Sequence, residues 1–225
     1  MIDRRKLLSR ALMAFAAGAV ILMLLIFLPA GTLRYFGGWL LTGILFVPML
    51  AMGLVMYVKA PELLGKRLSA KEREQDQQLV VKLSGGMFLL GFVIAGLDFR
   101  FGWLPLPKWV QIAAAVIFLG GYALYAEVLR ENAYLSRTVE VQQGQKVIDT
   151  GLYGIVRHPM YLATLLMFTA VPLVLGSVTA LPVFLIYPAL MVVRIRNEEQ
   201  VLRKGLTGYA AYCDKVKYRL IPFIW

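Results

Sequence analysis

One long apolar stretch near the C-terminus decides the fold: residues 160–193 read MYLATLLMFTAVPLVLGSVTALPVFLIYPALMVV. None of these residues is charged, and Gly176 and Ser177 interrupt the apolar pattern near its middle. At about 1.5 Å per residue, helices over 160–175 and 177–193 would each be about 24–26 Å long, slightly less than the hydrocarbon layer of about 30 Å. The stretch therefore predicts a tight helical hairpin that just crosses a membrane.

Four longer apolar segments precede this hairpin, at 11–30, 37–58, 83–101 and 108–129. Each is close to the length of about 20 apolar residues that a transmembrane helix needs. Of the 225 residues, 60% are hydrophobic and only 16% are charged, whereas soluble domains have about 45–50% and about 25%. The sequence therefore predicts an all-α integral membrane protein with about six transmembrane helices, of which the last two form the short hairpin.

The polar residues that chemistry needs are concentrated after residue 126. We therefore expect residues 1–107 to form a transmembrane scaffold of three spans. Residues 108–225 would form the catalytic subdomain, with three spans, a cytosolic loop and a tail. The first span follows basic residues, as a signal peptide would, but its apolar run of about 18 residues exceeds the usual core of about 7–15. We expect it to remain as an anchor.

The basic residues predict how the chain is oriented. With six spans and a cytosolic N-terminus, the cytosolic segments would be 1–10, 59–82, 130–159 and 194–225, and these contain 21 of the 24 lysines and arginines. Loops on the cytosolic side of membrane proteins carry such an excess. We therefore expect both termini in the cytoplasm.

Several functional classes are excluded by composition. The chain has a single cysteine, Cys213, and a single histidine, His158, so an internal disulfide, a zinc finger and CxxC redox chemistry are ruled out, and no metal site is expected. No Walker loop or GxGxxG motif is present. The basic residues that give the chain its formal net charge of +11 lie between apolar spans. Membrane topology and anionic lipids explain such residues without a nucleic-acid partner.

The first candidate site is the turn that enters the hairpin, residues 149–161, which reads DTGLYGIVRHPMY. Its two glycines permit tight turns, and Pro159 suits the first position of a helix, with His158 as the cap. The free N–H groups of that helix start, with Arg157 beside them, would favour a carboxylate or phosphate. The alternative is an interfacial helix start with a capping histidine and an arginine that extends to the headgroups.

The second candidate site follows the hairpin at residues 194–199, which read RIRNEE. If the helix continues, Arg194 and Glu198 share one face, and Arg196 and Glu199 share another. Only one glutamate can then face a given pocket, where its carboxylate could accept hydrogen bonds from two ribose hydroxyls. Exposed ion pairs one helical turn apart are the alternative.

Two prolines within the last span, Pro182 and Pro188, are expected to kink it. Irregular helices at membrane depth occur where they line a cavity or are buried in protein. We therefore expect the short helices to close over the 151–161 turn and form a ligand cleft. The end of the chain, with GYAAY at 208–212 and YRLIPFIW at 218–225, is aromatic and basic, as an interfacial helix would be.

Taken in order, four segments resemble the isoprenylcysteine carboxyl methyltransferase family and the related phospholipid methyltransferases. They are GLYGIVRHPMY at 151–161, RIRNEE at 194–199, GYAAY at 208–212 and YRLIP at 218–222. The resemblance covers roughly residues 120–225, and its ordered combination is more specific than any single segment.

The resemblance implies an integral membrane methyltransferase with a C-terminal pocket, open to the cytosol, for S-adenosylmethionine. S-adenosylhomocysteine would be the product, and a lipophilic or lipidated acceptor would enter from the bilayer. The resemblance implies that residues of its first two segments bind the cofactor: Tyr153, Arg157, His158, Pro159, Tyr161, Glu198 and Glu199. Arg194 or Arg196 could hold an anionic acceptor, because arginine binds carboxylates through two hydrogen bonds. A carboxylate acceptor is already ionised, so the site mainly has to align the reactants.

Other functions stay open from the sequence. An amine acceptor, as in a phospholipid N-methyltransferase, would need deprotonation, for which His158 or a glutamate is available. Membrane sterol reductases share a similar C-terminal architecture and use NADPH, so a sterol or lipid reductase is the enzymatic alternative. A lipid-binding or transport protein is disfavoured because charged residues are scarce at mid-membrane depth and no inverted repeat is visible.

Overall fold

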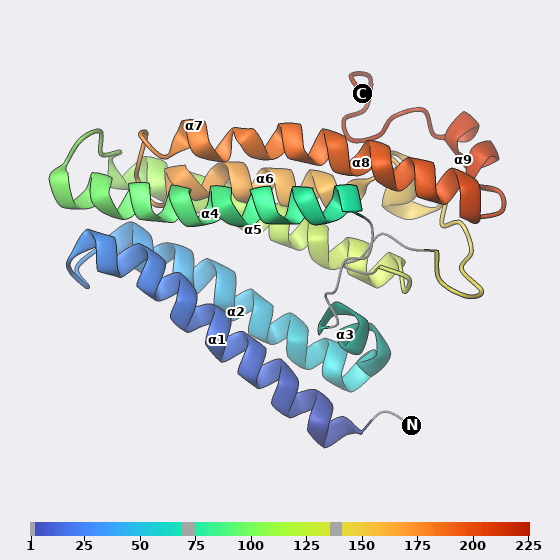
Figure 1. The fold of residues 1–225 in the computed structure, drawn as a ribbon, viewed down its shortest axis with the longest axis horizontal. Coiled ribbons are helices and arrows are strands. Elements are labelled where there is room, and N and C mark those ends of the chain that lie inside the picture. Colours follow the sequence, from blue (N-terminus) through green and yellow to red (C-terminus); the bar gives the residue numbers. More distant parts are fainter. Residues whose placement is uncertain (1–2, 69–74, 136–140) are drawn as a thin grey trace.

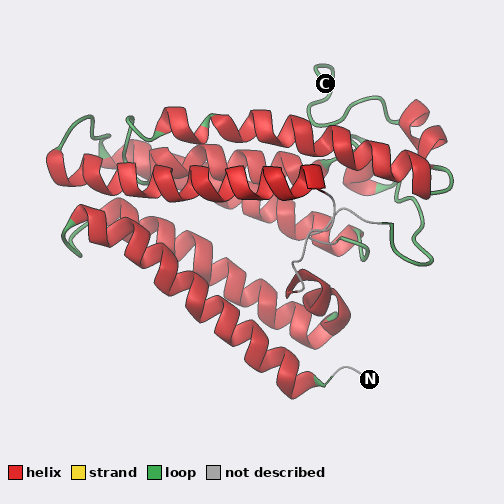
Figure 2. Cartoon of the chain, in the orientation of Figure 1, coloured by secondary structure: helices red, strands yellow, loops and turns green. Residues whose placement is uncertain are grey.

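The computed structural model describes residues 3–68, 75–135 and 141–225, which fold into helices joined by loops (Figures 1 and 2). No β-strand occurs among these residues, which confirms the prediction of an all-α protein. Parts of the expected cytosolic segments 59–82 and 130–159 lie outside the described residues. The helices are α1 (Arg4–Ala30), α2 (Phe36–Lys59), α3 (Pro61–Leu68), α4 (Gln75–Phe101), α5 (Lys108–Glu131), the 3₁₀ helix η1 (Gly151–Gly154), α6 (Pro159–Val174), α7 (Leu181–Phe184), α8 (Ile186–Gly205) and α9 (Tyr209–Lys215).

Four of these helices, α1, α2, α4 and α5, are long and apolar enough to cross a membrane. They coincide with the four long segments that the hydropathy pattern predicts. The apolar helix α6 is shorter, with 16 residues, and it is followed by α7 and α8, which run back beside it (Figure 1). The helices thus support an integral membrane protein whose last two apolar helices form a hairpin.

The second helix of the hairpin begins later than expected, at Leu181 rather than at residue 177. Residues 176–180 form the turn instead. Gly176 has a φ of +75°, a conformation that glycine adopts without steric cost, and the Ser177 hydroxyl accepts a hydrogen bond of 3.2 Å from the Ala180 N–H. The turn is also held from outside, because the buried Asp98 of α4 accepts a hydrogen bond of 2.5 Å from Ser177.

The two prolines of the last span differ in their effect. Pro182 lies in the first turn of α7, where its missing N–H interrupts nothing. Pro188 can donate no hydrogen bond to the carbonyl of Phe184, and its ring would collide with that carbonyl in a regular helix. The helix is accordingly broken at Leu185, between α7 and α8. The expected kink is present at this one place, and α8 then continues through residues 194–199 as a regular helix.

The chain reverses direction at each apolar helix, so the polar segments gather at one end of the molecule (Figure 1). This end, called the polar end below, comprises the start of α1, α3, residues 132–135 and 141–158, α9 and the C-terminal tail. The opposite end carries the short turns after α1, α4 and α6. This arrangement is the one that the distribution of basic residues predicts, although the side of the membrane stays a prediction.

Close packing of small residues joins the helices of the C-terminal half. At Gly121 of α5 a Cβ atom would lie 2.9 Å from Met167 Cγ and 3.0 Å from the Ala163 carbonyl of α6, so only glycine permits this approach. Helix α4 packs against α8 as well as against α1. The expected division of the chain at residue 107 stays a proposal, and α4 contacts helices on both sides of it.

Candidate functional site

The turn before α6 is shaped by a glycine and a carboxylate. Gly151 has a φ of +55°, and the Glu131 carboxylate at the end of α5 accepts hydrogen bonds of 3.2 and 3.0 Å from the Leu152 N–H. A Cβ atom on Gly151 would overlap that carboxylate. The turn therefore requires glycine for two independent reasons, and it fixes where η1 and the start of α6 lie relative to α5.

The residues that begin α6 are bound to the C-terminal tail. The backbone N–H groups of Arg157 and His158 donate hydrogen bonds of 2.9 Å to the carbonyls of Tyr218 and Arg219. The Arg157 guanidinium also donates to the carbonyls of Val216 and Lys217, at 2.6 and 2.8 Å. These bonds place the tail beside the helix start, although about 60 residues separate the two segments.

Glu199 of α8 lies at the centre of a buried ionic cluster. Its carboxylate accepts hydrogen bonds from Arg157 Nε at 2.7 Å and from Arg219 Nε at 3.0 Å, and His158 Nε2 lies 3.3 Å away. Only 4% of Glu199 is exposed. Burial raises the pKa of this carboxyl, but the hydrogen bonds and charges of His158 and Arg157 outweigh burial and lower the pKa to about 2. The cluster thus holds α6, α8 and the tail together through an ionised glutamate.

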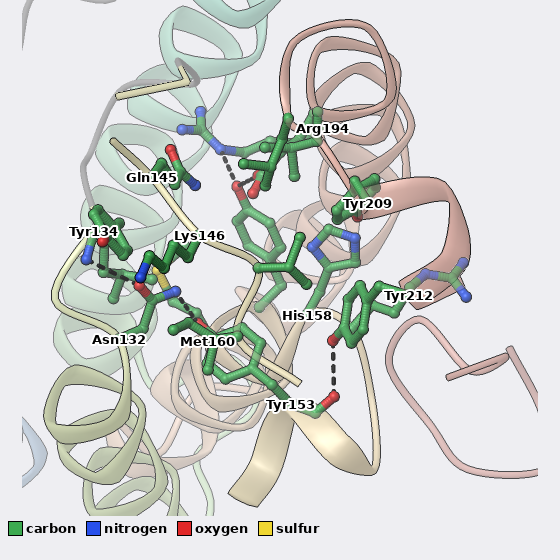
Figure 3. A pocket seen from close by; sticks show the side chains of 18 residues that line it. Asn132, Tyr134, Gln145, Lys146, Tyr153, His158, Met160, Arg194, Tyr209 and Tyr212 are labelled. Carbon is green, nitrogen blue, oxygen red and sulfur yellow. Dashed lines mark hydrogen bonds between the residues drawn. The ribbon is translucent and has the colours of Figure 1, made fainter. Parts of the chain in front are cut away.

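A pocket opens beside this cluster at the polar end, formed by residues 132–135 and 145–148, η1, and parts of α6, α8 and α9 (Figure 3). Its lining residues are Asn132, Tyr134, Leu135, Gln145, Lys146, Val147, Ile148, Tyr153, Arg157, His158, Met160, Tyr161, Arg194, Glu198, Leu202, Leu206, Tyr209 and Tyr212.

A chain of hydrogen bonds crosses one wall of the pocket. Arg194 Nε donates a bond of 2.9 Å to the Tyr161 hydroxyl, and that hydroxyl donates in turn to the Glu198 carboxylate. Tyr161 is therefore fixed between a cation and an anion. The Glu198 carboxylate, with several lone-pair sites, can still accept hydrogen bonds from a ligand.

Tyrosines form much of the remaining wall (Figure 3). The Tyr212 hydroxyl donates a bond of 2.8 Å to the Tyr153 carbonyl, and Asn132 donates one of 3.0 Å to the Tyr153 hydroxyl. The Tyr209 hydroxyl is buried and has no nitrogen or oxygen partner among the described residues. Burial raises the pKa of all three phenols, so each is a neutral hydrogen-bond donor at physiological pH.

The structure brings most of the predicted site residues together. Those that line the pocket are Tyr153, Arg157, His158, Tyr161, Arg194 and Glu198. Pro159 lies in the first turn of α6 and Glu199 in the ionic cluster, and neither lines the pocket. Arg196 is exposed on another face of α8 and does not line it either. His158 takes the expected N-cap position, but its side chain makes no capping bond and lies against Glu199 instead.

Several lining residues were not among the predicted site residues. Tyr209 and Tyr212 belong to the GYAAY segment, where a spacing of three residues places both on one helix face. That spacing could have identified them. Asn132 and Tyr134, after the end of α5, carried no recognisable pattern, and only the fold brings Asn132 to Tyr153 and Tyr134 into the pocket lining.

Two comparisons with known proteins show what this chain is similar to. Over 91 residues, 39% of this chain, the sequence is 38% identical to the protein named Delta(14)-sterol reductase TM7SF2 of Mus musculus. The chain spans 22% of the length of that relative. The model of the isoprenylcysteine carboxyl methyltransferase (ICMT) family matches residues 112–204, from the first turns of α5 to the end of α8. The resemblance of the C-terminal half to the isoprenylcysteine carboxyl methyltransferase family is thereby confirmed.

Proposed function

We propose that this protein is a membrane-embedded methyltransferase that uses S-adenosylmethionine and acts on a lipophilic acceptor, most similar to isoprenylcysteine carboxyl methyltransferases. The observation that carries the proposal is the pocket at the polar end, which is built largely within the residues that match that family. The excess of basic residues at this end supports a cytosolic pocket and cytoplasmic termini.

The lining of the pocket suits an adenosyl compound. The Glu198 carboxylate can accept bonds from ribose hydroxyls. The buried Tyr209 hydroxyl lacks a nitrogen or oxygen partner among the described residues, and a polar ligand would supply one. Tyrosine rings can stack on an adenine base and attract a sulfonium cation through their faces. We assign direct cofactor contacts to Glu198 and the tyrosines. Arg157, His158 and Glu199 would act by holding the start of α6 in place.

When bound in this pocket, S-adenosylmethionine would supply an electrophilic methyl group for an acceptor oxygen, and the sulfur would keep the electron pair of the broken carbon–sulfur bond and leave as the thioether S-adenosylhomocysteine. A carboxylate acceptor needs no base for this step, so the chain has only to align the reactants and exclude water. Arg194 is the residue that we assign to an anionic acceptor, because it lines the pocket and a guanidinium has five donors. Arg196, which is exposed, has no such role in this proposal.

Two other reactions compete with this one. An amine acceptor would need a base, and the His158 Nε2 atom is directed at Glu199. A sterol or lipid reductase is supported by the similarity to the mouse protein, but NADPH carries an additional phosphate that calls for additional cations. Arg157 is paired with Glu199, but Lys146 and Arg194 also line the pocket and could meet that phosphate. The match of residues 112–204 to the methyltransferase family is what favours the methyltransferase.

Calorimetric titration of the purified protein with S-adenosylmethionine, S-adenosylhomocysteine and NADPH tests the proposal. We expect both adenosyl compounds to bind and NADPH not to bind. Glu198→Gln should weaken adenosyl binding at least tenfold, because hydrogen bonds to a charged group contribute about 1.5–3 kcal/mol. Gln200→Ala, at an exposed position two residues further along α8, is the matched control. Binding of NADPH alone would overturn the proposal in favour of the reductase.

A further inference from the structure

A second cavity, of about 560 Å³, lies between the N-terminal helices and the C-terminal half. Helices α1, α2 and α3 form one side of it, and α5 and α6 form the other. Its lining is mostly leucine, methionine, alanine and phenylalanine. The volume falls within the range of about 300–1,000 Å³ that is typical of small-molecule sites. Below, this cavity is called the apolar chamber.

At the polar end of the molecule, the apolar chamber contains a cation that has no anionic partner among the described residues. Arg67 of α3 lines the chamber, and one guanidinium nitrogen donates a hydrogen bond to the Tyr125 hydroxyl of α5. The other terminal nitrogen, Nη1, is buried and has no hydrogen-bond partner among the described residues. Leaving a charged donor buried without a partner is costly. A ligand anion at this point would satisfy it.

The apolar chamber adjoins the pocket of the proposed methyl donor. On α6, Met160 and Tyr161 line the pocket, and Thr164 and Met167, about one and two turns further along, line the chamber. Tyr125 belongs to the same apolar cluster as Met160. A ligand with its anionic group at Arg67 would therefore have its head beside the pocket and its chain between α1 and α2, toward the middle of the membrane.

We infer that the apolar chamber holds the hydrocarbon chain of the methyl acceptor and that Arg67 binds the acceptor's anionic group while the lipid occupies the chamber, before Arg194 holds that group in the pocket. This inference rests on the proposed methyl transfer and specifies its substrate class: a lipid with a long chain and a carboxylate or phosphate. Most of the chamber comes from α1, α2 and α3, which lie outside the residues that match the methyltransferase family. Arg67 is thus a specificity-determining residue contributed by the N-terminal half.

Two glycines of α2 provide a matched test. Gly53 lines the chamber, and a Cβ atom there would meet nothing within 4 Å. Gly43 has the same open surroundings but does not line the chamber. Gly53→Phe should place a ring inside the chamber, where it would obstruct a hydrocarbon chain, whereas Gly43→Phe makes the same change in the same helix outside the chamber.

The experiment uses a sixteen-carbon fatty acid with a photoreactive diazirine in its chain, and the corresponding alcohol, added to the full-length protein in phosphatidylcholine nanodiscs at alkaline pH. Mass spectrometry locates and quantifies the labelled peptides. For the wild type we expect labelling of α1, α2, α5 and α6 at the chamber, about tenfold stronger with the acid than with the alcohol. Arg67→Gln should make the two equal. Gly53→Phe should weaken labelling by both probes, and Gly43→Phe should change neither.

Full acid preference in Arg67→Gln, or wild-type labelling in Gly53→Phe, would overturn the inference. Titration of the same samples with S-adenosylhomocysteine distinguishes a failure of the chamber inference from a failure of the proposed function. If the adenosyl compound binds and labelling ignores both substitutions, the chamber assignment fails and the methyltransferase proposal stands. If labelling follows the expected pattern but no adenosyl compound binds, the acceptor assignment fails together with the methyltransferase.

Discussion

The pocket and the apolar chamber lie next to each other at the polar end, but the arginines beside them differ in how fully they are hydrogen-bonded. Beside the pocket, Arg157 has hydrogen bonds to Glu199 and to two tail carbonyls. Beside the chamber, Arg67 has one bond to Tyr125 and a buried nitrogen without a partner among the described residues. The comparison teaches that internal hydrogen bonds fix the shape of the pocket, whereas the Arg67 donor beside the chamber is not satisfied by any of the described residues.

The largest effect is expected when Glu199, at the centre of the ionic cluster beside the pocket, loses its charge. Glu199→Gln would leave Arg157 and His158 buried without their anion, and breaking a buried ion pair costs about 3–5 kcal/mol. We expect a large fall in the unfolding temperature in detergent, together with loss of adenosyl binding. Glu198→Gln should instead weaken binding and leave the unfolding temperature nearly unchanged. Equal stability of both variants would contradict the distinction between the two glutamates.

Acid should act on the same cluster. The pKa of the Glu199 carboxyl is lowered from 4.5 to about 2 in the folded protein. Its contribution to stability is therefore complete above about pH 4.5 and is lost as the pH falls toward 2, by about 3 kcal/mol in total. Unfolding curves between these pH values should show a steeper loss for the wild type than for Glu199→Gln. Parallel pH dependence in the two proteins would show that the glutamate is not ionised as described.

Substitutions of two glycines compare the tightly packed turn before α6 with the open apolar chamber. Gly151→Ala would place a Cβ against Glu131 at a positive φ, and we expect a loss of about 2 kcal/mol. Gly53→Ala, where a Cβ meets nothing within 4 Å, should be neutral or slightly stabilising, because alanine is the better helix former. Thermal unfolding of both variants measures the difference, and a comparable loss at the two positions would mean that the chamber is packed.

The smallest effect is expected from Arg67→Gln in the absence of an anionic lipid. This substitution removes one hydrogen bond to Tyr125, but it also removes a buried charged nitrogen without a partner among the described residues. We expect the free energy of unfolding to change by less than about 1 kcal/mol. Denaturation in phosphatidylcholine nanodiscs checks this value. A loss as large as that of Glu199→Gln would show that Arg67 already has a full set of partners.

Much of the membrane architecture could be predicted from the sequence. The four long helices follow from uninterrupted apolar segments, because hydropathy over about 20 residues is a local property. The start of the hairpin's second helix could not be placed, since residues 176–180 are held by Asp98 and by the turn after α4. Asp98 is 79 residues away from Ser177 in the chain, and the turn after α4 is about as distant.

The candidate site was likewise predictable only in part from the sequence. Its motifs indicated the turn before α6 and the RIRNEE segment, because the pattern of glycine, proline and charge is visible locally. Adjacent glutamates leave a helix about 100° apart, so a single sequence does not tell which of them faces a ligand. The packing of α8 against the tail decides this: Glu199 faces Arg157 and Arg219, and Glu198 faces the pocket.

The sequence by itself determined that this is a helical membrane protein, that its last apolar helices form a hairpin, and that polar chemistry gathers after the fourth span. These properties depend on composition and short-range periodicity. Only the tertiary structure decided which glutamate lines the pocket, that Arg194 rather than Arg196 reaches it, and that α1 to α3 enclose a chamber beside it. Each of these depends on contacts between segments far apart in the chain, which no local pattern encodes.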